Sequence, residues 1–181
     1  SGLDPEFIRA VEYIVNDRGL DIEDYDFMWT CEGSYKSRLI VPFYYQGDIV
    51  GYTARKLGDG SPKYITDSQP GYVFNLDGQG YDRQFVIVVE GPFDAISVGG
   101  VAVLRNEVND QQSMLINSLQ LVTDAVKYGW SVSFPEWPDN DIKDVAEAVE
   151  RYGKIYTMQK IVSSKVTGLK IQLLAKTYFA E

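Results

Sequence analysis

The amino-acid sequence lacks histidine altogether and holds a single cysteine, Cys31, among its 181 residues. Without histidine, nucleophilic catalysis by a Ser-His-Asp or Cys-His arrangement is excluded. One cysteine cannot form an intrachain disulfide and cannot supply the ligands of a Cys/His zinc site. The chemistry left open depends on carboxylates, lysine, arginine and tyrosine, and hard metal ions are the natural helpers of such groups.

Long apolar runs are missing as well. No stretch approaches the roughly 18 apolar residues that a membrane-spanning helix needs, and the first residues lack the basic and then apolar layout of a secretion signal. Apolar residues make up 45% of the chain and charged residues 24%, which is typical of globular proteins. We therefore expect one domain, or one domain with a small appendage, and no membrane contact.

Positive charge is scarce, because 17 Lys and Arg residues face 26 Asp and Glu residues and give a net charge of −9. A chain this acidic is not expected to bind nucleic acid through a broad basic surface. Four cations nevertheless lie within 26 residues of one another. They are candidates for contacts with template or nucleotide phosphates: Arg38, Arg55, Lys56 and Lys63.

The first part of the chain, residues 1–82, predicts a small α+β subdomain. Residues 4–18 place their apolar side chains on one helical face, and Asp4 can cap that helix. Residues 38–45 and 49–55 have strand-like composition on either side of a short turn, which predicts a hairpin. The candidate cations therefore surround a hairpin and the loop that follows it.

The second part, residues 83–153, predicts an α/β domain. Runs rich in β-branched residues at 85–89, 101–104 and 130–134 alternate with helical segments. Such continuous apolar runs are typical of strands buried on both faces, in a mainly parallel sheet with helices on both sides. Residues 154–181 predict a further helical segment.

The alternation of strands and helices fails at one point. Helices predicted over 110–119 and 121–128 meet at Gln120 with no strand between them. A parallel sheet needs a strand there, because each crossover must return the chain to the same edge of the sheet. One strand and its turns are therefore missing between Gln120 and Leu121.

The strand predicted at 85–89 ends in the sequence EGPFDA, residues 90–95. Open α/β sheets place their sites at the carboxyl ends of strands. Glu90 lies at such an end, and Asp94 in the first helical turn is near enough to share a metal ion or a hydrogen-bond network with it. The alternative is that Glu90 only ends the strand and Asp94 only caps the helix.

Another group of acidic residues follows the strand predicted at 130–134. Asp139, Asp141 and Asp144 stand in the sequence PDNDIKDV. They lie again at the carboxyl end of a strand, which favours a role in the same site. The alternative is a helix N-cap, with acidic side chains that favour the helix dipole.

These motifs resemble a known family. The strand followed by Glu-Gly and Asp-Ala is similar to the opening motif of TOPRIM domains, which occur in primases, type IA and type II topoisomerases and some nucleases. The segments RLIVPF (38–43), GYTAR (51–55) and GSPKYI (60–65) resemble the part that precedes TOPRIM in bacterial-type (DnaG-like) primases. The resemblance spans residues 36–152. The high number of tyrosines, 13, resembles phage-encoded primases more than cellular ones.

The resemblance implies roles for individual acidic residues. Glu90 would be the metal-linked acid of the first TOPRIM motif, and Asp94 its nearby catalytic partner. Asp144 would supply a further catalytic carboxylate and metal ligand, with Asp141 as a secondary ligand. Where primases often carry another aspartate, this chain has Ala146. The ion implied is Mg²⁺ or Mn²⁺, both of which prefer oxygen ligands.

The second TOPRIM motif, Asp-x-Asp at the end of the third strand, has no counterpart. Its expected place, between Leu119 and Leu121, coincides with the missing strand. Three explanations stay open: a segment of the natural protein is absent from this sequence, the segment has been deleted, or the chain is a TOPRIM relative without the metal pair. We favour the first. An intact mass about 1–2 kDa above the calculated 20.4 kDa would support it.

The resemblance implies the catalytic core of a DNA primase, which makes short RNA primers on single-stranded DNA from NTPs in the cytoplasm of a bacterial or phage-infected cell. The zinc module that bacterial-type primases usually carry is not on this chain. A replicative helicase or a separate zinc-binding domain is therefore expected as a partner. The alternatives are a TOPRIM nuclease or topoisomerase fragment, and a TOPRIM-derived binding module without catalysis.

Overall fold

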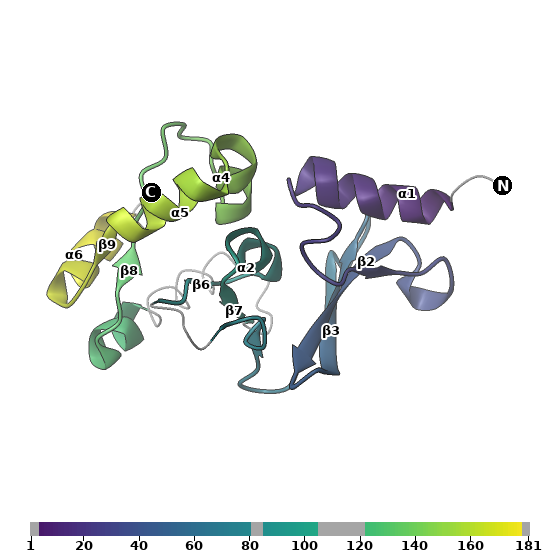
Figure 1. The fold of residues 1–181 in the computed structure, drawn as a ribbon, viewed down its shortest axis with the longest axis horizontal. Helices are drawn as coiled ribbons and strands as arrows, with labels where there is room; N and C mark the ends of the chain where they lie inside the picture. The colour runs from purple at the N-terminus through teal and green to yellow at the C-terminus, as the bar shows by residue number, and fades with distance from the viewer. Residues whose placement is uncertain (1–3, 81–84, 105–121, 179–181) are drawn as a thin grey trace. The chain divides into compact units, whose positions relative to one another are not determined.

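A computed structural model describes the chain over residues 4–80, 85–104 and 122–178. Figure 1 shows its helices and strands in chain order. None of the helices in these ranges is long and apolar enough to cross a membrane.

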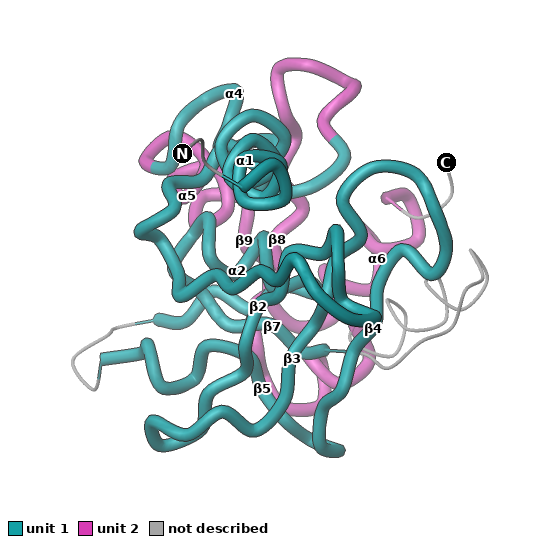
Figure 2. Tube along the Cα trace, turned by 90° about the vertical axis from the view of Figure 1, so that its right-hand side faces the viewer, with its two compact units in different colours: residues 1–105, 143–154 teal, residues 106–142, 155–181 magenta. Residues whose placement is uncertain are grey.

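The chain divides into two compact units (Figure 2). Unit 1 comprises residues 1–105 and 143–154, and unit 2 comprises residues 106–142 and 155–181. This division rests on contacts in space, and the three-part division expected along the sequence stays a prediction.

Unit 1 begins with the predicted N-terminal helix. Helix α1 (Pro5–Glu12) continues into a wider π-type turn, η1 (Tyr13–Asp17). The Asp4 carboxylate caps α1, because its Oδ1 accepts a hydrogen bond from the Glu6 N–H at 2.8 Å. Together these elements confirm the helix expected over residues 4–18.

An antiparallel sheet follows, in the order β1-β2-β3-β4. Its strands are β1 (Met28–Trp29), β2 (Arg38–Tyr45), β3 (Asp48–Lys56) and β4 (Tyr64–Asp67). A short 3-10 turn, η2 (Gly33–Tyr35), precedes β2. The β2–β3 pair confirms the predicted hairpin.

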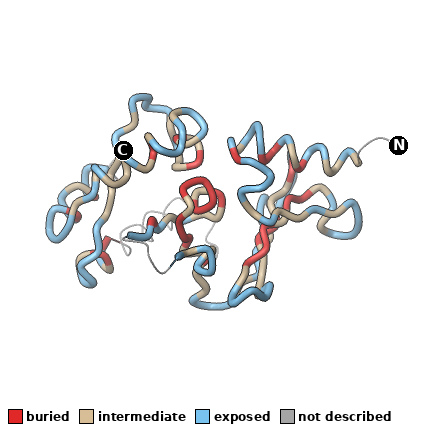
Figure 3. Tube along the Cα trace, in the orientation of Figure 1, coloured by how far each residue is buried: buried red, intermediate tan, exposed pale blue. Residues whose placement is uncertain are grey.

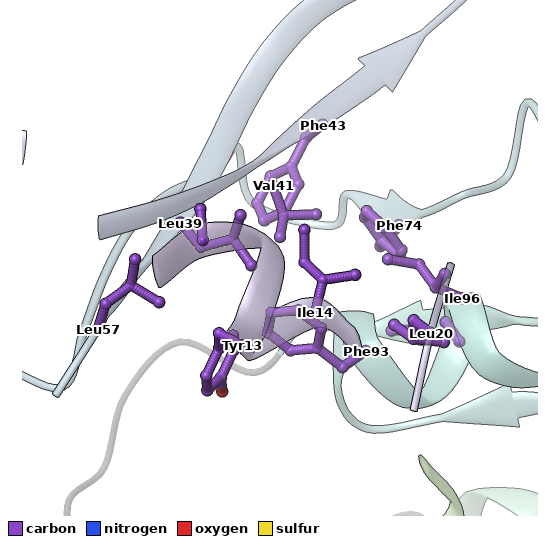
Figure 4. Packing of buried hydrophobic residues seen from close by; sticks show 13 residues of the cluster. Tyr13, Ile14, Leu20, Leu39, Val41, Phe43, Leu57, Phe74, Phe93 and Ile96 are labelled. Atoms are coloured by element: carbon purple, nitrogen blue, oxygen red, sulfur yellow. The ribbon is translucent and has the colours of Figure 1, made fainter. Parts of the chain in front are cut away.

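The core of unit 1 lies where α1 and η1 meet one face of the hairpin (Figure 3). Side chains on alternate positions of β2 point to this face, as the period of a strand requires. Figure 4 shows them beside Ile14 of η1 and the aromatic side chains of Phe74 and Phe93. The largest members of this cluster are Tyr13, Leu39, Phe43, Phe74 and Phe93.

The second sheet of unit 1 is small and mixed. Strand β7 (Val101–Val103) pairs antiparallel with β5 (Val73–Phe74) and parallel with β6 (Val88–Val89). Helix α2 (Pro92–Val98) connects β6 to β7, and helix α4 (Val145–Tyr152) packs against α2.

The mixed α/β class is as expected, but the mainly parallel sheet is not found among the described residues. Of the strands in residues 4–80, 85–104 and 122–178, only β6 and β7 form a parallel pair. The predicted strand over 85–89 is shortened to Val88–Val89, and its side chains are not covered on both faces. Phe85, Val86 and Val88 are 53%, 46% and 55% exposed.

Unit 2 contains helical residues 122–128 and the strand pair β8 (Val132–Ser133) and β9 (Lys165–Val166). Helices α5 (Lys154–Ser163, whose first residue belongs to unit 1) and α6 (Leu169–Tyr178) flank β9, and the break expected at Gly168 is confirmed. A separate small core holds Val122, Ala125, Ile171 and Ala175.

Strand β8 differs from its prediction. Residues 130–134 were expected to join the parallel sheet, whereas β8 pairs antiparallel with β9. Strand β9, which comes later in the chain, thus supplies the hydrogen-bond partners for the backbone of β8. The point between Gln120 and Leu121 and the helix expected at 110–119 lie outside the described residues.

Candidate functional site

Glu90 and Asp94 lie at the carboxyl end of β6, as their spacing predicted. Glu90 follows the strand and is exposed. Gly91 is the N-cap of α2, and Asp94 lies in the first turn of that helix. A Cβ atom on Gly91 would come within 3.1 Å of Asp94 Oδ2, so glycine here leaves space beside the carboxylate.

Asp144 meets Asp94 at the start of α4. The Asp144 side chain caps that helix, because its Oδ1 accepts a hydrogen bond from the Glu147 N–H at 2.8 Å. One residue earlier in the same turn, the Ala146 N–H donates to Asp94 Oδ1 at 3.0 Å. Free amides of a helix start therefore hold both carboxylates. We call Glu90, Asp94 and Asp144 the carboxylate group.

The carboxylates of this group repel one another. The pKa of Asp94 is raised to about 6, mainly by burial and next by the negative charge of Asp144. The hydrogen bond from Ala146 and the positive charge of Arg18 lower this pKa, and Glu90 adds a further rise. A cation bound among these carboxylates would relieve the same repulsion.

Arg18 joins the carboxylate group to a set of cations. Its Nη1 lies 3.9 Å from Asp144 Oδ2, and its guanidinium carbon lies 4.6 Å from the centre of the Phe93 ring. Burial lowers the pKa of Arg18, but nearby tyrosines and Asp144 raise it by more. The sequence prediction missed Arg18. The local feature that could have indicated it is a basic residue directly before Gly19.

Gly19 brings this part of the chain against α4. Its φ of 60° is left-handed, and a Cβ atom there would lie 2.7 Å from Glu150 Cβ. Glycine is the residue that accepts both conditions without strain. The backbone after Arg18 therefore lies directly on the helix that Asp144 caps.

Tyr13 connects Arg18 to Arg55. Its hydroxyl accepts a hydrogen bond from Arg18 Nε at 2.8 Å and another from Arg55 Nε at 2.9 Å. Tyr64 completes the set: its hydroxyl accepts from Arg18 Nη2 at 3.3 Å, and its ring lies 4.9 Å from the Arg55 guanidinium carbon. We call Tyr13, Arg18, Arg55 and Tyr64 the arginine group.

The other predicted cations lie differently. Arg38 is 5% exposed and donates to the backbone carbonyls of Ala54 at 3.2 Å and Pro62 at 3.0 Å. Its side chain thus holds the loop before β4, and its contact with phosphate stays a prediction. Lys63 is exposed, and Lys56 lines an open hollow of about 580 Å³.

That hollow lies between the end of α1 and the turn after β3. Arg9 and Lys56 contribute positive charge to it, whereas Glu12, Asp17 and Asp59 contribute negative charge. Its mixed lining favours no single class of ligand.

Asp141 is exposed and belongs to unit 2. Its predicted role as a secondary metal ligand stays a prediction. Unit 1 therefore contains two sets of charged side chains, the carboxylate group and the arginine group. The ion pair between Arg18 and Asp144 connects them.

The donor chemistry of the carboxylate group fits a hard divalent cation. All its side-chain donors are oxygen atoms, and Mg²⁺ is commonly held by one or two carboxylates together with substrate phosphates. Within the part of the chain that the structure describes, no three potential ligand side chains lie close enough to hold an ion by themselves. Phosphate oxygens or water would complete such a site.

Comparison with known proteins gives likenesses in structure. No family model matches the sequence. No curated protein matches it either. Solved structures do match over most of the chain, at low sequence identity.

An E. coli primase catalytic core matches with a TM-score of 0.69 and 15% identity, over 96% of this chain and 78% of its own. A structure of the DnaG catalytic core matches with a TM-score of 0.71 and 15% identity over the same shares. A DnaG primase catalytic domain bound to ssDNA matches with a TM-score of 0.57 and 15% identity, over 90% of this chain and 70% of its own. The chain therefore has the fold of a DnaG-type primase catalytic core.

Proposed function

We propose that this chain is the catalytic core of a DNA primase, a nucleotidyltransferase that makes short RNA primers on single-stranded DNA from NTPs. One observation carries the proposal: in a fold of the primase type, Arg18 contacts the carboxylate group and is joined to a second arginine, Arg55, through the Tyr13 hydroxyl. Arg18 Nη1 lies 3.9 Å from Asp144 Oδ2 and Arg18 Nε lies 2.8 Å from the Tyr13 hydroxyl. Phosphoryl transfer needs this combination of anion-binding and metal-binding side chains.

The arginine group supports the binding of a phosphate. Two guanidinium groups donate to the same phenol oxygen, so two positive charges lie close together. Among the described carboxylates, Asp144 forms the ion pair with Arg18, at the long distance of 3.9 Å. Two guanidinium groups whose positive charge is only partly neutralised favour the binding of an anion with several oxygens. Arg55, Lys56 and Lys63 would contact the phosphates of template or nucleotide.

The carboxylate group would hold Mg²⁺ or Mn²⁺, with Glu90 and Asp144 as ligands and Asp94 beside them. The chemistry that such an ion supplies is activation of the attacking hydroxyl and stabilisation of the leaving pyrophosphate. The chain's own part is to hold the Asp94 and Asp144 carboxylates by amides at the start of α4, so that their oxygens are already in place. Asp141 would be a secondary ligand.

We assign the β6–α2–β7 segment and α4 to a TOPRIM-type domain. The finer division into 1–82, 83–153 and 154–181 belongs to the same proposal. The partners we propose are the DNA template, NTPs, and a replicative helicase or a separate zinc-binding domain. The activity would take place with replicating DNA in the cytoplasm of a bacterial or phage-infected cell.

A second candidate function is a binding module without catalysis. The sequence contains no Asp-x-Asp at the expected place, and no three ligand side chains are clustered in the described ranges. Such a module would bind single-stranded DNA or nucleotide but would not join nucleotides. Mn²⁺ binding by calorimetry, abolished in Glu90→Gln, would speak against it.

The decisive experiment is a primer-synthesis assay on single-stranded DNA with NTPs and Mg²⁺ or Mn²⁺. We expect short RNA products that disappear in Glu90→Gln and persist in Glu23→Gln, the same change at an exposed residue that belongs to neither group. Plasmid nicking is measured in parallel. Nicking without primers would favour a TOPRIM nuclease, and DNA binding without either would favour the binding module.

A further inference from the structure

The Tyr13 hydroxyl makes an unusual pair of hydrogen bonds. It accepts from Arg18 Nε at 2.8 Å and from Arg55 Nε at 2.9 Å. A hydroxyl oxygen has two acceptor lone pairs, so the two arginines use its full acceptor capacity. Arg18 is five residues from Tyr13 along the chain, whereas Arg55 is 42 residues away.

The outer nitrogens of the two arginines differ in their partners. Each arginine spends its Nε–H on Tyr13, which leaves the Nη groups at the outer end of each guanidinium. Arg18 directs Nη2 to the Tyr64 hydroxyl and Nη1 toward Asp144. The Nη groups of Arg55 have no hydrogen-bond partner within residues 4–80, 85–104 and 122–178.

A phenol is suited to this position because it holds the cations without neutralising them. A carboxylate in its place would accept the same hydrogen bonds but would cancel one positive charge. The tyrosine ring adds attraction, since the guanidinium carbons of Arg18 and Arg55 lie 5.3 and 5.5 Å from its centre.

The core fixes Tyr13 itself. The residue is 8% exposed, and its ring packs edge-on against Phe93 with 5.9 Å between centroids. Figure 4 shows its oxygen at the border of the cluster, directed away from the aliphatic side chains. The ring is thus anchored on the apolar side, and the hydroxyl is presented to the arginines at a fixed place.

We infer that Tyr13 is a positioning residue, whose hydroxyl holds the guanidinium groups of Arg18 and Arg55 side by side so that both face one phosphate-bearing ligand. This inference rests on the proposed function, because it specifies how the anion-binding side of that site is ordered. Tyr13 does not touch the ligand. It acts through the two arginines, and through Arg18 it also fixes the distance to the carboxylate group.

The variant Tyr13→Phe tests this inference, because it keeps the ring and removes only the oxygen. The first measurement is the set of arginine Nε–H resonances of the free protein by NMR. We expect the Arg18 and Arg55 resonances to lose their protection from exchange with water, because their common acceptor is gone. Resonances unchanged from those of the natural sequence would overturn the inference.

The second measurement is binding of a labelled single-stranded oligodeoxynucleotide at several salt concentrations. We expect affinity to fall about tenfold at low salt, the size of one hydrogen bond to a charged group. We also expect the slope of log K against log salt to become shallower by about 0.7, as when one phosphate contact is lost. An unchanged slope would contradict the inference, because loss of stability alone does not alter it.

Tyr25→Phe is the matched control. Tyr25 is another partly buried tyrosine of unit 1, and its hydroxyl donates to the Pro42 carbonyl at 2.7 Å rather than to an arginine. We expect this variant to lose stability but to keep the arginine resonances and the salt slope. If the unaltered protein bound no oligonucleotide or NTP, the proposed function would fail, whereas the resonances would still decide the role of Tyr13.

Discussion

The carboxylate group and the arginine group are held in place by different means. Backbone amides at the start of α4 hold two of the carboxylates, since Ala146 donates to Asp94 and Glu147 donates to Asp144. Side chains hold the arginines, through the Tyr13 hydroxyl and aromatic rings. Backbone amides move only when the helix moves, whereas each phenol hydrogen bond can be removed by deleting one atom. The carboxylate group should therefore resist substitution of its neighbours better than the arginine group does.

Glu90→Gln should give the largest effect, because it removes a charge from the carboxylate group without removing an amide contact. We expect primer synthesis to fall on the order of 10²–10³-fold, as for loss of a group that stabilises transition-state charge. The melting temperature should hardly change, since Glu90 is exposed. A variant that unfolds would show instead that Glu90 has a structural role.

A pair of substitutions at Asp144 separates its charge from its helix cap. Asparagine caps a helix about as well as aspartate, whereas alanine costs about 1 kcal/mol of stability. We expect Asp144→Asn and Asp144→Ala to lose primer synthesis alike, but only the alanine variant to be less stable in urea unfolding. Full activity of Asp144→Asn would exclude its carboxylate from the reaction.

The raised pKa of Asp94 predicts a pH dependence of stability in metal-free buffer. Its folded pKa is about 6 against an ordinary value of 3.8, so the folded state binds the proton more tightly than the unfolded state. The free energy of unfolding should therefore decrease as pH rises from about 4 to about 6, by up to about 3 kcal/mol.

The Asp94→Asn variant checks this origin of the pH dependence. Urea unfolding between pH 4 and 7 should show a flatter profile than that of the unaltered protein, because the titrating group is gone. The same slope in both proteins would assign the pH dependence to other groups.

Lys63→Ala should give the smallest effect. Lys63 is exposed, so its loss would remove the phosphate contact proposed for it and no packing. We expect the affinity for single-stranded DNA to fall about two- to fivefold at low salt and the difference to vanish at high salt. Lys154→Ala, at another exposed lysine, serves as the control in the same fluorescence titration.

The two groups also differ in how far the sequence could predict them. Glu90 and Asp94 are four residues apart, and the cap at Asp144 is a local motif. Short-range spacing was therefore enough to identify these residues as candidates for the site. The Tyr13–Arg55 contact joins residues 42 positions apart, and the Arg18–Tyr64 contact joins residues 46 positions apart. No periodicity in the sequence encodes such pairs.

The fold divides in the same way. Strand-like composition on either side of a short turn was enough to predict the hairpin of β2 and β3, because both strands and the turn lie close together in the sequence. The continuous apolar run at 85–89 predicted a strand buried on both faces, but burial of a second face depends on distant elements. For Arg38 the sequence could not distinguish a surface charge from a buried donor, because both occur as one basic residue in a strand.

Gly19 sets a limit on how this protein can vary. The backbone there approaches α4 so closely that no side chain fits between them, and the φ angle is one that other residues rarely adopt. The residue before it carries the guanidinium that links the two charged groups. Tolerance to substitution at position 19 is thus set by the distance from a backbone to a helix, not by any charge or reactive group of its own. A residue with no side-chain chemistry thereby controls the spacing on which the chemistry depends.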